Sequence, residues 1–322
     1  MITMDPLSAD GLLPLVIRPT IPNVDLFSWA AENRELLTQK LFHHGGLLFR
    51  GFGAFEAAQL EHFIRGVSGE PLAYNERSSP RHKVDGNIYT STDHPANQYI
   101  FLHNENSYQH TWPMKIFFLS IDQARSGGET PIADCRAILH SIDPSVRAAF
   151  QEKGFRIVRN YNQGMGLKWQ TVFNSNDPAV VDAYCAKNQI RTEWLPGGAL
   201  RTTTLRGNPV AVHPITGEET WFNHGTFFHV TTLGKEMSET LMACLPVESL
   251  PTNSYYGDGS TIEAEVLEHL RATYHKHTVK FPWEQGDLLM LDNMLAAHGR
   301  SPFKGTRKVV VGMSEPMSRE AL

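Results

Sequence analysis

The stretch Tyr99-Ile100-Phe101-Leu102-His103-Asn104-Glu105 runs from apolar residues into two side chains that can bind a metal. In an extended strand, residues i and i+2 point to the same face, which predicts that His103 and Glu105 converge on one point from a single strand. Among the fifteen histidines, only His103 is followed two residues later by a carboxylate. Roughly one or two such pairs are expected by chance, so this spacing is compatible with a metal site or with a hydrogen-bonded pair.

A further candidate ligand, His298, lies far downstream in Leu291-Asp292-Asn293-Met294-Leu295-Ala296-Ala297-His298-Gly299-Arg300. If adjacent antiparallel strands carry the two histidines, His298 lies beside His103 and Glu105. Two histidines and one carboxylate on one face form the ligand set of non-haem Fe(II) oxygenases. A strand-end histidine bonded to the backbone is the alternative interpretation of His298.

Bulk composition excludes several classes of function. The chain has 322 residues, of which 41% are hydrophobic and 20% charged, with a net charge of −5. This mild acidity gives no electrostatic case for binding nucleic acid or an anionic membrane. The longest apolar runs are strand-sized, below the ~20 residues of a membrane helix. The start, Met1-Ile2-Thr3-Met4-Asp5-Pro6-Leu7, does not resemble a secretory signal, and Cys135, Cys185 and Cys244 are expected as buried or partly buried thiols. We expect a soluble cytoplasmic protein.

Apolar periodicity predicts a β-rich α+β chain with peripheral helices. Helices are expected over residues 23–42, 55–67, 134–140, 144–153, 178–189 and 261–274. Strands are expected over residues 46–52, 99–105, 114–121, 200–205, 210–213, 220–223, 278–281, 288–291 and 309–313. We expect a single domain over residues 1–322, with a helical and loop insertion over about 131–200 between core strands. That insertion and residues 74–98 are candidates for lid and substrate loops.

Arg307 is a candidate anchor for a carboxylate, because it opens the apolar strand Val309-Val310-Val311-Gly312-Met313. A guanidinium group binds a carboxylate through two parallel hydrogen bonds. Arg300 and Lys304 compete for this role, and an ordinary arginine facing water is the alternative. Thr130, which follows Gly127-Gly128-Glu129, could add a hydroxyl donor or be a plain loop residue.

Motifs in a fixed order carry a family resemblance. They are His103-Asn104-Glu105-Asn106, Pro113–Phe118 (PMKIFF), Gly127–Asp134 (GGETPIAD), Trp221-Phe222-Asn223-His224, Tyr255–Gly259 (YYGDG), Leu291-Asp292-Asn293 and His298-Gly299-Arg300 with Arg307. Together they resemble the TauD/TfdA-type Fe(II)- and 2-oxoglutarate-dependent dioxygenases, in particular the SyrP-like branch that neighbours clavaminate synthase. The similarity runs from about residue 45 to 315.

The resemblance implies a double-stranded β-helix (jelly-roll) core in which His103, Glu105 and His298 hold the iron. It also implies that Arg307 binds the distal carboxylate of 2-oxoglutarate beside Thr130, and that O2 is the oxidant. Two features depart from the usual pattern of the family. The carboxylate is a glutamate, which argues against the related halogenases, and the gap between His298 and Arg307 is shorter than usual.

The resemblance further implies hydroxylation of an unactivated C–H bond, with release of succinate and CO2. The expected substrate is an amino-acid-like or carrier-protein-tethered small molecule of secondary metabolism, with Asn223, Arg201 and Arg206 as candidate contacts. Desaturation or epoxidation by the same kind of enzyme stays open, as does a non-redox, cupin-like metal-binding protein. A homo-oligomer also stays open.

Overall fold

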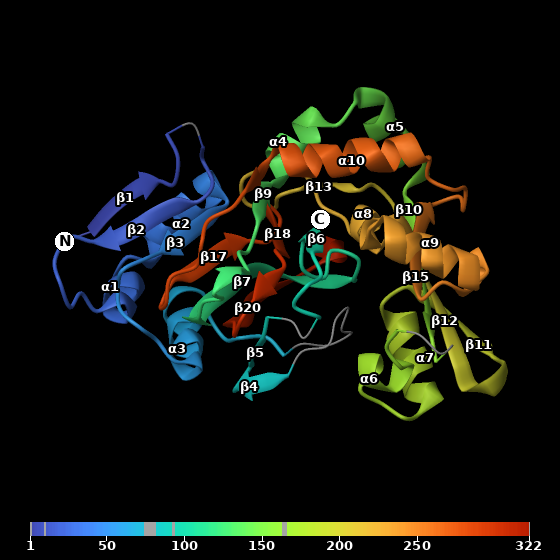
Figure 1. Ribbon diagram of the computed structural model, residues 1–322, viewed down its shortest axis with the longest axis horizontal. Helices are drawn as coiled ribbons and strands as arrows, with labels where there is room; N and C mark the ends of the chain where they lie inside the picture. The colour runs from blue at the N-terminus through green and yellow to red at the C-terminus, as the bar shows by residue number, and fades with distance from the viewer. Residues whose placement is uncertain (1, 10, 74–81, 92–93, 163–165, 322) are drawn as a thin grey trace.

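An eight-stranded sheet forms the centre of the structure (Figure 1). The computed structural model describes residues 2–9, 11–73, 82–91, 94–162 and 166–321. Across the sheet the strands are β1 (Ile2–Pro6), β2 (Leu15–Pro19), β3 (Gly46–Phe49), β17 (Leu288–Asp292), β7 (Thr111–Asp122), β20 (Lys308–Ser318), β5 (Ile88–Thr90) and β4 (Lys83–Asp85). Residues Trp112–Ser120 of β7 are all buried, which requires that both faces of the sheet are covered.

Three helices cover one face of this sheet: α1 (Leu26–Glu32), α2 (Arg34–His44) and α3 (Ala57–Val67). The prediction of one helix over residues 23–42 is therefore wrong. Asp25 caps the start of α1 by accepting from the Phe27 backbone N–H at 3.0 Å. Asn33 ends α1, because its side chain and its backbone N–H both donate to the Trp29 carbonyl oxygen. The chain then restarts as α2, so a single apolar pattern is shared by two short helices.

A four-stranded sheet packs on the other face. Its order is β16 (Thr278–Val279), β9 (Ile132–Asp134), β18 (Ala296–Arg300) and β6 (Ile100–His103). Ile132 and Ala296 of this small sheet share a buried cluster with Ile116, Phe118 and Leu289 of the large sheet. The outer face of the small sheet is covered by α4 (Cys135–Ser141) and α10 (Ala264–Lys276). The layers run helix, sheet, sheet, helix, which confirms the predicted β-rich α+β class.

A separate sheet forms a projecting lobe, here called the arm, at the lower right of Figure 1. It contains β11 (Ile190–Leu195), β12 (Ala199–Arg206), β10 (Phe155–Tyr161) and β15 (Thr252–Tyr256), with α6 (Trp169–Phe173) and α7 (Pro178–Lys187) beside them. The expected insertion over 131–200 does not match these bounds. Its first strand, β9, pairs with β18 of the core, and the arm recruits β15 from much later in the chain.

The remaining elements connect these layers. They are β8 (Ser126–Gly127), α5 (Pro144–Lys153), β13 (Val210–Val212), β14 (Glu219–Trp221), α8 (Gly225–Phe228), α9 (Lys235–Cys244), β19 (Phe303–Lys304) and 3-10 turns at Pro196–Gly198, Val230–Leu233, Val247–Ser249 and Arg319–Ala321. Cys244 at the end of α9 is exposed, contrary to expectation, whereas Cys135 and Cys185 are buried. No helix in the described ranges is long and apolar enough to cross a membrane. Within the expected lid segment 74–98, residues 74–81 and 92–93 lie outside the described residues.

Candidate metal centre

The two candidate histidine ligands are cross-strand partners. Strand β18 pairs antiparallel with β6, and His298 lies opposite His103 in the register. Their ring centroids are 4.5 Å apart. Residues that face each other across an antiparallel pair bring their side chains to the same side of the sheet. The predicted pairing of the two histidine strands is confirmed.

Glu105 reaches the same place by a different route from the one predicted. Strand β6 ends at His103, and Glu105 lies in the turn that follows, so the i, i+2 argument on one strand is wrong. Asn106 has a left-handed φ of 56°, which turns the chain away from the strand direction. The Glu105 carboxylate nevertheless lies 3.7 Å from His298 Nε2. One candidate ligand atom from each of the three residues lies within 4.8 Å of the others.

The donor set fits a divalent metal ion. His103, Glu105 and His298 are only 8%, 1% and 4% exposed, and a buried carboxylate is costly unless a cation offsets its charge. His103 Nδ1 lies 2.8 Å from the Phe101 carbonyl oxygen and donates to it, which orients the ring and makes Nε2 the nitrogen suited to bind a metal. Two imidazoles and one carboxylate are the ligands that non-haem Fe(II) sites use.

Aromatic rings surround the candidate ligands. The ring centroids of Phe227 and His224 lie 4.5 and 5.3 Å from that of His103, and the Phe118 ring centroid lies 5.1 Å from that of His298. Burial, followed by repulsion from the His103 imidazole, holds the pKa of His224 well below its ordinary value, so this imidazole is neutral. Its Nδ1 lies 2.9 Å from Ser107 Oγ, and its Nε2 is buried without a hydrogen bond to any described residue. His224 belongs to the Trp221-Phe222-Asn223-His224 motif, but nothing in its spacing along the sequence distinguishes it from a core residue.

Arg307 lies against the double-glycine loop. It donates from Nε to the Gly128 carbonyl oxygen at 2.8 Å and from Nη1 to Ser91 Oγ at 3.1 Å. Its Nη2 has no hydrogen-bond partner among the residues that the structure describes. A Cβ on Gly128 (φ +78°) would lie 3.0 Å from Arg307 Cδ, so glycine permits this close approach. Burial, together with nearby Arg300, lowers the pKa of Arg307 to about 10, and it stays charged at neutral pH.

The competing cations are placed differently. Arg300 donates from its two terminal nitrogens to the carbonyl oxygens of His94, Pro95 and Gln98, at 2.6 to 2.9 Å. Lys304 is exposed. Thr130 is buried, and its Oγ1 accepts from Trp283 Nε1 at 3.2 Å. Arg300 Nε is also buried without a hydrogen bond to a described residue, so the two arginines differ at their terminal nitrogens: both are paired in Arg300, whereas Nη2 of Arg307 is not.

Two of the candidate substrate contacts lie near the centre. Asn223, which precedes His224, is buried, and its Oδ1 accepts from the Gly225 N–H at 3.0 Å. Its Nδ2 has no hydrogen-bond partner among the described residues. Arg206 donates from Nε to the Tyr108 carbonyl oxygen at 3.0 Å. Arg206 thus contacts the turn that follows Glu105. This contact is structural, whereas a contact with the substrate was expected.

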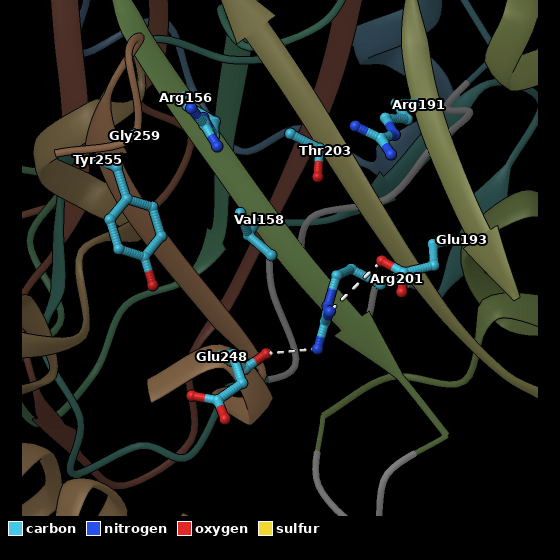
Figure 2. Close-up of a pocket in the computed structure, with 9 residues that line it drawn as sticks. All are labelled: Arg156, Val158, Arg191, Glu193, Arg201, Thr203, Glu248, Tyr255 and Gly259. Atoms are coloured by element: carbon cyan, nitrogen blue, oxygen red, sulfur yellow. Dashed lines mark hydrogen bonds and ion pairs between the residues drawn. The ribbon is translucent and has the colours of Figure 1, made fainter. Parts of the chain in front are cut away.

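Arg201 lies elsewhere, in a pocket of about 270 Å³ on the open face of the arm sheet (Figure 2). Its Nη2 donates to the Glu248 carbonyl oxygen at 2.9 Å, and its Nη1 lies 3.4 Å from the Glu193 carboxylate. The three candidate metal ligands do not line this pocket. Side chains alternate along β12, so Arg201 and Arg206 face opposite sides of the sheet. The prediction that both reach one site is wrong for this reason.

Comparison with known proteins gives consistent matches. Residues 9–313 match the model of the family described as taurine catabolism dioxygenase TauD, TfdA family. The dapdiamide synthesis protein DdaC of Enterobacter agglomerans is 41% identical over 283 residues, covering 88% of this chain and 84% of DdaC. The clavaminate synthase-like protein At3g21360 of Arabidopsis thaliana is 24% identical, covering 93% of each chain.

Solved structures show the same fold. PvcB of Pseudomonas aeruginosa superimposes with a TM-score of 0.57 at 19% identity, covering 97% of this chain and 90% of PvcB. PvcB is described as an Fe, alpha-ketoglutarate dependent oxygenase from an isonitrile synthetic pathway. A taurine dioxygenase from Burkholderia xenovorans superimposes with a TM-score of 0.53 at 17% identity, covering 100% of this chain and 92% of that one.

Proposed function

Because the chain belongs to the TauD/TfdA family of dioxygenases, we propose that it is an Fe(II)- and 2-oxoglutarate-dependent dioxygenase with its metal on His103, Glu105 and His298. One observation carries the proposal. Three buried side chains from distant parts of the sequence bring their ligand atoms within 4.8 Å of one another.

The protein's own residues would bind the metal and 2-oxoglutarate, orient them, and exclude water. When bound, Fe(II) supplies the redox chemistry by which O2 and 2-oxoglutarate oxidise an unactivated C–H bond, with succinate and CO2 released. His103, Glu105 and His298 would hold the metal within reach of 2-oxoglutarate and the substrate. The Phe118 and Phe227 rings lie against the two histidines and limit the access of water.

Arg307 is the proposed anchor for the distal carboxylate of 2-oxoglutarate. The Gly128 carbonyl oxygen positions Arg307, and Thr130, the proposed neighbour of this anchor, follows Gly128 by two residues. A partly buried guanidinium group with an unpaired terminal nitrogen is suited to a charge-assisted hydrogen bond. The three carbonyl contacts of Arg300 support a structural role for that residue instead.

Hydroxylation of an amino-acid-like or carrier-protein-tethered small molecule in secondary metabolism is the proposed reaction. The support is the 41% identity to DdaC, whose name places that protein in dapdiamide synthesis. Desaturation or epoxidation is the alternative reaction at the same site. The jelly-roll description of the core, the SyrP-like branch, the single-domain organisation and a cytoplasmic location belong to the same proposal, and Asn223 is the retained substrate contact.

The test uses purified, metal-free protein. Anaerobic addition of Fe(II) and 2-oxoglutarate should produce a visible metal-to-ligand charge-transfer band, and admission of air should yield succinate. His298→Ala should abolish both signals, whereas Arg201→Ala in the arm should preserve them. A protein with neither band nor succinate would not be a 2-oxoglutarate-dependent oxygenase, and binding of a metal without these signals would favour the non-redox alternative. Succinate release with candidate substrates, followed by a search for the added mass of one oxygen atom, would then identify the substrate.

A further inference from the structure

Glu105 leaves its strand before the metal site, so something other than strand pairing must position it. The side chain of Asn293 contacts the Glu105 backbone instead. Its Oδ1 accepts from the Glu105 backbone N–H at 2.7 Å, and its Nδ2 donates to the Glu105 carbonyl oxygen at 2.8 Å. One amide side chain thereby pairs with both backbone groups of the ligand residue, as a neighbouring strand would.

Asn293 is itself held from several sides. It is fully buried, and its backbone N–H donates to the Met114 carbonyl oxygen at 2.8 Å. Its Nδ2 also donates to the Pro113 carbonyl oxygen at 2.8 Å, and its own carbonyl oxygen accepts from Asn104 Nδ2 at 2.7 Å. All three hydrogen-bonding positions of the amide face a partner of the matching kind, so the side chain has a single orientation.

Asp292 shapes the turn on which Asn293 lies. Its Oδ1 accepts from the backbone N–H groups of Met294 and Leu295, at 2.9 and 3.0 Å. Its Oδ2 accepts from His213 Nε2 at 3.0 Å, and both side chains are buried. The turn leads directly into β18, which carries His298. One turn therefore sets the position of His298 through the chain and the position of Glu105 through Asn293.

Arg319 holds the far end of the turn that follows Glu105. It donates from Nη2 to the Ser107 carbonyl oxygen and from Nε to the Gln109 carbonyl oxygen, the latter at 3.1 Å. Its guanidinium group lies over the Trp112 ring, 5.4 Å from the centroid. Charge-assisted bonds to two carbonyl groups hold this segment against the end of β20.

We propose that Asn293 is a positioning residue for Glu105, with Arg319 holding the rest of the turn, so that the carboxylate is in place before a metal binds. The proposal rests on the assignment of Glu105 as a metal ligand and deepens it. It assigns the Asp292-Asn293 pair two separate tasks: Asp292 shapes the turn, and Asn293 aligns the ligand.

The arm offers a matched control. Asn160 is also buried and also makes three side-chain hydrogen bonds, accepting from Arg201 Nε and donating to the carbonyl oxygens of Glu248 and Leu250. Removing either amide leaves buried backbone groups without partners, so Asn293→Ala and Asn160→Ala should both lower the melting temperature. They should differ in metal affinity, because only Asn293 contacts the ligand turn.

The readout is Co(II) affinity, measured anaerobically from the visible absorption of the metal-loaded protein. Asn293→Ala should weaken Co(II) binding roughly 10–100-fold, the usual cost of losing an outer-shell partner. Asn160→Ala should stay within about twofold of the unaltered protein. The Co(II) affinity of Arg319→Ala should lie between those of these two variants, since this substitution leaves the contacts of Asn293 with Glu105 intact.

Equal Co(II) affinity in a folded Asn293→Ala variant and the unaltered protein would overturn this inference alone. If Asn293→Ala does not fold, Asn293→Ser, which retains a hydroxyl for one partner, enters the same comparison. No Co(II) binding by the unaltered protein would overturn the metal assignment as well, so the two failures are distinguishable.

Discussion

The metal centre and the arm pocket both gather charged side chains, but under opposite conditions. In the metal centre, Glu105 is buried between two imidazoles. In the arm, Arg201 lies on an open face, 3.4 Å from a half-exposed Glu193 side chain and beside the Glu248 carbonyl oxygen (Figure 2). Exposed ion pairs contribute about 0–1 kcal/mol, whereas an uncompensated buried charge costs several. Burial, and not the number of charges, therefore determines how strongly a charged side chain needs a compensating partner.

The largest expected effect is at Glu105. Glu105→Ala removes the only carboxylate of the proposed ligand set, so the charge-transfer band and succinate formation should both be lost. The decrease should exceed the roughly 10–100-fold that loss of an outer-shell partner costs. Anaerobic absorption and succinate assays measure it. A variant that retains both signals would remove the distinction between the two regions.

Arg307 gives the next effect. Arg307→Ala removes the proposed partner of a buried carboxylate, a loss of about 2–5 kcal/mol, so the 2-oxoglutarate concentration for half-saturation should rise on the order of 100-fold. Titration of the charge-transfer band measures it, and iron affinity should change little. Arg300→Ala is the matched comparison. An increase with Arg300→Ala and none with Arg307→Ala would move the anchor to Arg300.

Metal binding should stabilise the protein, because it offsets the buried charge of Glu105. At a Co(II) concentration 100 times the dissociation constant, the free energy of unfolding should rise by about 2.7 kcal/mol. Differential scanning calorimetry with and without Co(II) measures this as a shift of a few degrees in melting temperature. The shift should disappear in His298→Ala and persist in Arg201→Ala. Equal shifts in both variants would place the bound metal elsewhere.

The smallest expected effect is in the arm. Glu193→Gln removes the negative charge beside Arg201, and the loss in the free energy of unfolding should be about 1 kcal/mol or less. Chemical denaturation measures it, and raised salt should reduce the difference from the unaltered protein. A loss of several kcal/mol, or a change in Co(II) affinity, would mean that the two regions are coupled.

Prediction from the sequence was correct where a local pattern has one structural outcome. The apolar strands that end near His103 and His298 pair antiparallel, as expected, because apolar runs of that length are buried in a sheet. Prediction was wrong at the ends of elements, because the apolar pattern shows which face of an element a residue lies on but not where that element ends. The strand expected to include Glu105 ends at His103, and the helix over 23–42 is divided at Asn33.

Arg201 and Arg206 illustrate a second kind of error. Both are arginines of one strand, and composition alone gives no reason to separate them. The alternation along β12 places Arg201 in the arm pocket and Arg206 against the Tyr108 carbonyl oxygen. Their odd separation puts them on opposite faces of the strand, and the placement of the sheet decides what each face contacts.

The sequence by itself determined the types of ligand, the order of the motifs and the family, because these depend on residue identity and spacing. Only the tertiary structure decided how Glu105 reaches the histidines: its turn is held by Asn293, far away in the chain. Such a contact has no periodic signature, since it depends on two turns from different strands meeting at one edge of the fold. The tertiary structure also decided that Arg307, and not Arg300, keeps a terminal guanidinium nitrogen without a partner among the described residues, because hydrogen bonds to backbone carbonyl groups leave no trace in the sequence.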